Sequence, residues 1–182
     1  MGNTTGAFVV VQLNDAGTHC GGSTVRGRVY LDVQKSSVSA DSLNIRFYGR
    51  EHSRIEYSET EGSGDDSRTV SKTAHATNYF YDVDYQLCSY LDNTVQNGRY
   101  EYPFEIKLPL NIPGKQSFSQ FLASIDVTYH VEARLHRHGM LTWDVKNSME
   151  VLMLDPPYKR IPTPGFSPPS TLPIHRYSSN EA

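Results

Sequence analysis

The sequence predicts an all-β protein, a two-sheet antiparallel β-sandwich of immunoglobulin-like architecture, and three observations lead to that prediction. Apolar and polar residues alternate along several stretches, as they do on strands with one buried face. No segment shows the apolar repeat of an amphipathic helix. About eight strand-like stretches follow one another, which is the number expected of a two-sheet sandwich.

The first half of the chain begins with an apolar run and continues with alternating stretches. Residues 8–13 form an uncharged, mostly apolar run. In 25–33, every second residue is apolar or Gly and the residues between are mostly polar, and 43–50 repeats this pattern. A shorter strand is expected over 55–57, and a Tyr-rich one over 79–87.

The second half continues the alternation. Residues 100–108 and 141–154 are expected to form strands, and 125–135 shows the clearest pattern of the whole chain. A helix would scatter the apolar residues of 125–135 around its circumference. The register of this strand places Val131 in the core and Glu132 in solvent.

Two polar segments are expected to lie outside the sandwich. Residues 59–71 are polar, acidic and contain Gly, which predicts an exposed, mobile loop. Residues 155–173 hold seven prolines, which cannot donate hydrogen bonds to a sheet. We therefore expect one folded domain over residues 1–155 and a Pro-rich linker or tail over 156–182.

Composition narrows the classes of function. The net charge is −3 and the Lys and Arg residues are scattered, so the electrostatic footprint of a nucleic-acid binder is missing. No apolar run approaches the roughly 20 residues that span a bilayer, and the N-terminus lacks the layout of a secretory signal. The expected compartment is the cytoplasm.

Several motifs, in their order along the chain, resemble the N-terminal domain of arrestin-fold proteins. The closing strand 125–135 is the most specific of them. The pattern looks closest to the α-arrestin branch of trafficking adaptors, because Phe8–Leu13 carries no charge where visual and β-arrestins have a phosphate-sensing basic pair. The other matching motifs are Val25-x-Gly27-x-Val29-x-Leu31, Phe47-Tyr48-Gly49, Tyr102-Pro103-Phe104-x-x-x-Leu108-Pro109 and Ser117-Phe118.

The resemblance implies a non-catalytic adaptor or scaffold for protein transport, endocytosis and signalling. Such a protein would bind cytoplasmic segments of membrane cargo or receptors and link them to trafficking or ubiquitination machinery. A ubiquitin ligase would then be among its partners, and contact with the plasma membrane or endosomes would be peripheral.

No arrangement of residues in the sequence indicates catalysis or a cofactor. His130 lies about 20 Å along the strand from His136, too far for both to hold one zinc ion. Asp82 and Asp84 share a strand face without a general acid or base that the sequence can place beside them. We expect no enzymatic activity, no cofactor and no metal.

Three surfaces are candidates for partner binding, although an ordinary solvated or paired role competes at each. The first is the edge of the first strand at Val9, Val10 and Val11, which could accept a strand from a partner. The second is a basic cluster suited to acidic cargo tails or anionic lipid. The third is the start of the Pro-rich tail, where a Pro-Pro-x-Tyr motif would need a spacer that is missing. The basic cluster comprises Arg134, His136, Arg137, His138 and Lys146, and the tail site comprises Pro156, Pro157 and Tyr158.

Two other functions remain open from the sequence. Trp143 and the Tyr-rich strand could stack on sugar rings in a carbohydrate-binding or other ligand-binding sandwich. The domain could also be a purely structural half of a larger assembly.

Overall fold

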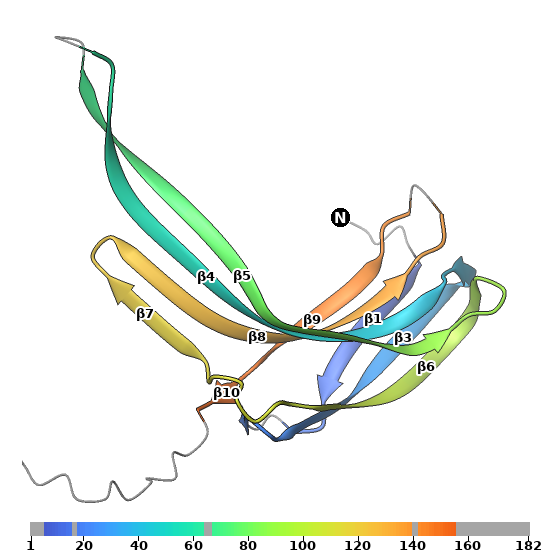
Figure 1. The fold of residues 1–182 in the computed structure, drawn as a ribbon. Coiled ribbons are helices and arrows are strands. Elements are labelled where there is room, and N and C mark those ends of the chain that lie inside the picture. Colours follow the sequence, from blue (N-terminus) through green and yellow to red (C-terminus); the bar gives the residue numbers. More distant parts are fainter. Residues whose placement is uncertain (1–5, 16–17, 64–66, 140–141, 156–182) are drawn as a thin grey trace, which may run out of the picture.

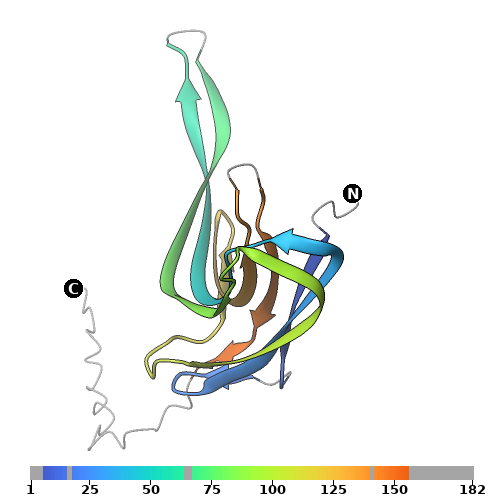
Figure 2. The same cartoon turned by 90° about the vertical axis from the view of Figure 1, so that its right-hand side faces the viewer.

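A computed structural model describes residues 6–15, 18–63, 67–139 and 142–155. These residues form strands and turns without any helix, which confirms the predicted all-β sandwich (Figure 1). Figure 2 shows the same strands from the side. The ten strands are β1 (Ala7–Leu13), β2 (His19–Cys20), β3 (Thr24–Ser39), β4 (Ser42–Glu61), β5 (Arg68–Ser89), β6 (Thr94–Lys107), β7 (Gln116–Gln120), β8 (Ala123–His136), β9 (Val145–Val151) and β10 (Met153–Leu154).

Two antiparallel sheets make up the sandwich. One has the strand order β1-β3-β6. The other has the order β5-β4-β8-β7, and β9 also pairs with β8. Strands β7 and β9 follow one another along β8, because β7 pairs with Ala123–Val127 and β9 with Tyr129–Leu135. A small parallel pair, β2 with β10, adds to this framework.

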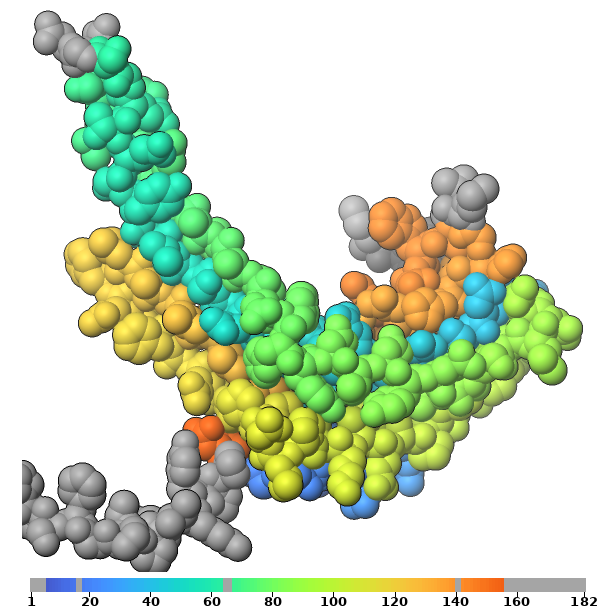
Figure 3. Space-filling view, in the orientation of Figure 1, coloured from blue at the N-terminus to red at the C-terminus, as the bar shows by residue number. Residues whose placement is uncertain are grey.

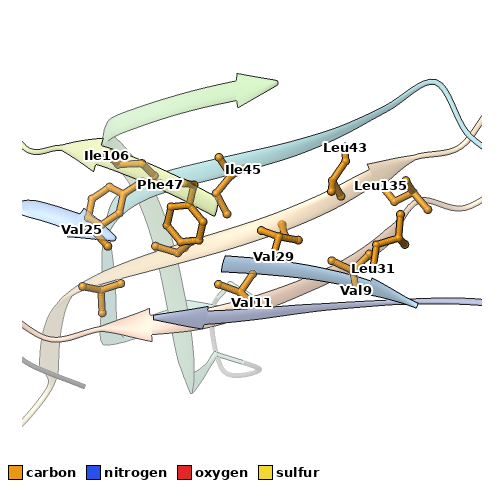
Figure 4. Close-up of a cluster of buried hydrophobic side chains, with 14 of the residues drawn as sticks. Val9, Val11, Val25, Val29, Leu31, Leu43, Ile45, Phe47, Ile106 and Leu135 are labelled. Atoms are coloured by element: carbon orange, nitrogen blue, oxygen red, sulfur yellow. The ribbon is translucent and has the colours of Figure 1, made fainter. Parts of the chain in front are cut away.

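The core lies between the inner faces of the two sheets, where the alternation in the sequence predicts it. Val9 pairs with Leu31 and Val11 with Val29 across β1 and β3, and all four side chains are buried. The opposite sheet contributes Leu43, Ile45, Phe47 and Leu135 (Figure 4). Burying each such side chain contributes about 1.5–3 kcal/mol of hydrophobic stabilisation.

The expected loop at residues 59–71 is mostly strand instead. β4 continues to Glu61 and β5 begins at Arg68, with Glu59 opposite Val70 in the ladder. Lys72 Nζ also lies 2.7 Å from a carboxylate oxygen of Glu59 and 2.9 Å from one of Glu61. Cross-strand pairing and these ion pairs suit an exposed ribbon, so the polar composition does not prevent strand formation here. The resulting β4–β5 arm projects well beyond the sandwich (Figures 1 and 3).

The register of β8 is as predicted for Val131, which is fully buried, but the expectation that Glu132 is solvated is wrong. Glu132 is only 7% exposed. Its carboxylate accepts a hydrogen bond from Arg134 at 2.6 Å, and its cross-strand neighbour on β4 is Arg46. Large polar side chains therefore cover the outer face of this sheet, so that face is a packed polar layer.

Candidate partner-binding site

Strand β1 lies at the edge of its sheet. Among the described strands it pairs only with β3. The Asn14 N–H donates to the Arg26 carbonyl, and the Gln34 N–H donates to the Gly6 carbonyl. These two bonds show which β1 residues are hydrogen-bonded to β3. Because backbone groups alternate along an antiparallel ladder, even-numbered β1 residues bond to β3 and the odd-numbered N–H and C=O groups point the other way.

Strand β9 meets that outward edge. It pairs with β8 through one of its edges, and the Asn147 side-chain oxygen accepts a hydrogen bond of 3.0 Å from the Val11 N–H. This bond confirms that an odd-numbered β1 amide points toward β9. One edge strand of each sheet thus faces the other across what we name the β1–β9 seam, between Val9–Leu13 and Val145–Leu152.

The seam widens into a groove on one side of Asn147. The groove has a volume of about 370 Å³. Met149 belongs to the inner face of β9, opposite the buried Val131, yet it is 41% exposed because it lines this groove. Apolar side chains make up much of the wall, together with two carboxylates. The lining residues are Gln12, Leu13, Asp15, Met149, Glu150, Val151 and Leu152.

The charged groups of the groove are acidic. Lys115 Nζ donates to a carboxylate oxygen of Glu150 at 2.6 Å, and this hydrogen bond lowers the pKa of Glu150 below its ordinary value. Glu150 is therefore ionised at neutral pH. Asp15 lies 3.3 Å from Nε2 of His19. None of the groove's lining residues is Lys or Arg. The groove therefore favours an extended segment with apolar and basic side chains.

The three β1 residues proposed from sequence occupy different positions. The Val9 and Val11 side chains are buried in the core, and only their backbone reaches the seam. Val10 is half exposed on the outer face of its sheet. Sequence reasoning missed Asn147 and Met149, because the short, mostly exposed strand β9 carries only a weak alternation.

The predicted basic cluster is spread over one end of the second sheet. Arg134 and Lys146 are cross-strand neighbours on β8 and β9, whereas Arg137 and His138 lie in the loop that follows β8. Three of the five have an acidic partner: Arg134 with Glu132, His136 with Asp144 and His138 with Asp41. The charge of Arg134 is therefore balanced locally by Glu132.

A network of rings and charges occupies the middle of the polar layer. Arg46 donates two hydrogen bonds to Asp82, of 2.7 and 2.5 Å, and its guanidinium lies 4.7 Å from the centre of the Tyr48 ring. The hydrogen bonds from Arg46 lower the pKa of Asp82. The His130 ring also stacks with Tyr48, with the ring centres 5.3 Å apart. These contacts fix the side chains, so we regard the network as structural.

His130 carries a buried ring nitrogen. Its Nε2 has no hydrogen-bond partner among the described residues. Burial, followed by the nearby charge of Arg50, lowers the pKa of His130. The imidazole is therefore neutral at physiological pH.

The remaining candidate residues do not come together into a further site. Across the described ranges, no group of three or more His, Cys, Asp or Glu side chains could hold a metal ion. Tyr79 belongs to β5, and Trp143 lies in the loop before β9. Pro156, Pro157 and Tyr158 fall outside the described residues. Nor does the described chain contain a helix long and apolar enough to cross a membrane.

The fold and the β1–β9 seam together define a β-sandwich domain in which one edge strand of each sheet lines a shared groove. Residues 9–155 match the family described as arrestin (or S-antigen), N-terminal domain. The match covers most of the sequence, so this chain belongs to the arrestin N-terminal domain family. The predicted resemblance is thereby confirmed at the level of the family.

The solved structure of the sporulation control protein Spo0M from Bacillus subtilis is among those similar to this chain. The two chains are 18% identical with a TM-score of 0.49, over 82% of this chain and 49% of Spo0M. This chain thus corresponds to about half the length of that protein.

Proposed function

We propose that this chain is a non-catalytic adaptor domain that binds an extended segment of a partner protein in the β1–β9 seam. The observation that carries the proposal is the pair of facing strand edges beside an apolar groove. A peptide strand that enters the seam could bond to odd-numbered β1 backbone groups on the groove side of the Val11–Asn147 bond and place alternate side chains against Leu13 and Met149. Family membership supports the same conclusion, since arrestin-type domains in general act as adaptors.

The chemistry of the groove indicates the kind of partner. Asp15 and Glu150 favour basic residues, and Leu13, Met149 and Leu152 favour apolar ones. We therefore propose cytoplasmic segments of membrane cargo or receptors in which apolar residues alternate with Lys or Arg. The uncharged Phe8–Leu13 strand agrees with recognition that does not depend on phosphorylation, as in the α-arrestin branch.

The wider role is part of the same proposal. The adaptor would link its cargo to trafficking or ubiquitination machinery, in the cytoplasm and at the plasma membrane or endosomes. Residues 1–155 would form the binding domain and 156–182 a linker or docking tail that a ubiquitin ligase could reach.

A matched pair of variants tests the seam. Met149→Lys places a positive charge in the groove and removes apolar surface, whereas Leu91→Lys makes the same kind of change at the fully exposed β5–β6 turn. With a peptide of alternating Leu and Lys, titration by fluorescence anisotropy should give about tenfold weaker binding for Met149→Lys. Leu91→Lys should bind like the unmodified chain.

Two results would contradict the proposal. One is equal affinity of the two variants, because binding would then occur elsewhere. The other is the absence of binding by the folded, unmodified chain to any alternating apolar and basic peptide.

A further inference from the structure

Strand β5 presents the least protected strand edge in the part of the chain that the structure describes. It pairs only with β4, so its other edge is a row of backbone N–H and C=O groups. From Thr73 to Tyr81 the strand contains no Lys, Arg, Asp, Glu or Pro. Charges and prolines are the usual devices that keep an edge strand from pairing with another chain.

The other strand edges carry such devices, are short, or face another strand edge. β6 includes Pro103 and charged residues at Arg99, Glu101, Glu105 and Lys107. β7 has only five residues, and the edges of β1 and β9 face one another across the seam. Among the described strands, β5 therefore has the edge that is best able to pair with another chain.

The geometry of the arm adds a reason for pairing. β8 pairs with β4 only as far as Ile55, and the Glu56 N–H donates to the Leu122 carbonyl just before β8, so 57–61 and 68–72 form a ribbon of two strands. A two-stranded ribbon without a third strand is marginally stable in water. This part of the arm stands clear of the sandwich, where another chain can reach it (Figure 3).

We propose that β5 pairs edge to edge, antiparallel, with β5 of a second copy of this chain. Near the ends of β5, Lys72 is already paired with Glu59 and Glu61 and Asp82 with Arg46, all on β4, whereas Arg68 and Asp84 are the outermost charges of the strand. Antiparallel pairing of two copies centred on Ala76 sets Arg68 of each copy opposite Asp84 of the other, whereas parallel pairing in register would oppose like charges.

The pairing is centred near Ala76. This residue is the midpoint of Thr73–Tyr79, the uncharged stretch before the irregularity in the ladder between Gly49 and Arg50. Ala74, Ala76 and Thr77 are small and exposed, so two strands can approach closely. The dimer leaves the seam open, because β5 and β9 lie on opposite sides of β4 and β8.

Sedimentation velocity of the full 182-residue chain tests the proposal. We expect a monomer–dimer equilibrium between about 1 and 100 µM. Ala76→Lys places two ammonium groups opposite each other and should raise the dissociation constant at least about tenfold. Ser58→Lys adds the same charge to β4 of the same arm and should leave the equilibrium unchanged.

A charge-swap experiment completes the test. Ala76→Lys and Ala76→Glu should each dimerise at least about tenfold more weakly than the wild-type chain when alone, and should form a heterodimer when mixed. Ala76 is exposed opposite Ser53, so far-UV circular dichroism should show both variants folded, and Ala74→Lys provides a second, independent edge variant. A monomeric wild-type chain throughout the range, an Ala76→Lys variant that dimerises normally, or a mixture without heterodimer would each overturn the proposal.

Discussion

Adjacent residues on β8 show how one strand serves both a dry core and a polar layer. Val131 points into the core, and Glu132 points to the opposite face, where it bonds to Arg134. The alternation of the sequence predicts the two directions correctly. It cannot predict the burial of Glu132, because that depends on side chains from other strands, above all Arg46, that only the fold brings alongside.

Substitutions at these two positions should therefore both destabilise the domain, by different amounts. Val131→Asp buries an unpaired carboxylate in the core and should cost several kcal/mol. Glu132→Ala removes a charged hydrogen-bond partner but leaves Arg134 partly in water, so we expect about 1–2 kcal/mol. Chemical denaturation measures both losses. A Glu132→Ala variant as stable as the wild-type chain would contradict the packed polar layer.

His130 should give the domain a measurable dependence on pH. The folded state lowers its pKa below the ordinary value of 6.5, so the unfolded chain binds more protons as the pH falls through that value. Stability from this residue is thus fully present above pH 6.5 and is lost as the pH falls toward the folded-state pKa. The charged groups around the ring are Arg50, Glu132, Glu150 and Lys115.

A comparison with a variant isolates this effect. Between pH 7.5 and about 5, the melting temperature of the wild-type chain should fall further than that of His130→Gln, which cannot gain the proton. Parallel melting curves for the two proteins would show that the buried ring nitrogen does not control this part of the pH response.

At the scale of elements, strand positions follow from the sequence better than strand ends. The strands 25–33, 43–50 and 125–135 are recognisable because each has a buried face that enforces alternation. The outer arm has no such face, so cross-strand partners such as Glu59 and Val70 hold it together. Pairing between strands leaves little trace in a single sequence, which is why 59–71 looks like a loop.

The candidate site was predictable only in part for the same reason. The uncharged first strand indicates an edge suited to strand addition, and β1 is an edge strand in the fold. The groove also needs Met149 and Glu150, which reach it only because β9 pairs with the far half of β8. No local pattern in the sequence indicates that β9 pairs with this part of β8.

The whole molecule separates its two proposed binding edges. The β1–β9 seam lies where the two sheets meet, and the free edge of β5 lies on the opposite side of the larger sheet. A dimer through the arms would therefore carry two open seams, and two seams could engage two segments of one cargo or two cargo molecules. Linked sites of this kind bind more tightly together than either does alone.

The most direct test of strand addition is amide hydrogen exchange of β1, residue by residue, with and without an alternating apolar and basic peptide. Odd-numbered amides such as Val9 and Leu13 point toward the seam, whereas Val10 and Gln12 already bond to β3. The account predicts that the peptide slows exchange at Leu13, on the groove side of the Val11–Asn147 bond, and leaves Val10 and Gln12 nearly unchanged. Equal slowing of exchange at odd-numbered and even-numbered amides, or no slowing in β1 when the peptide is bound, would contradict this prediction.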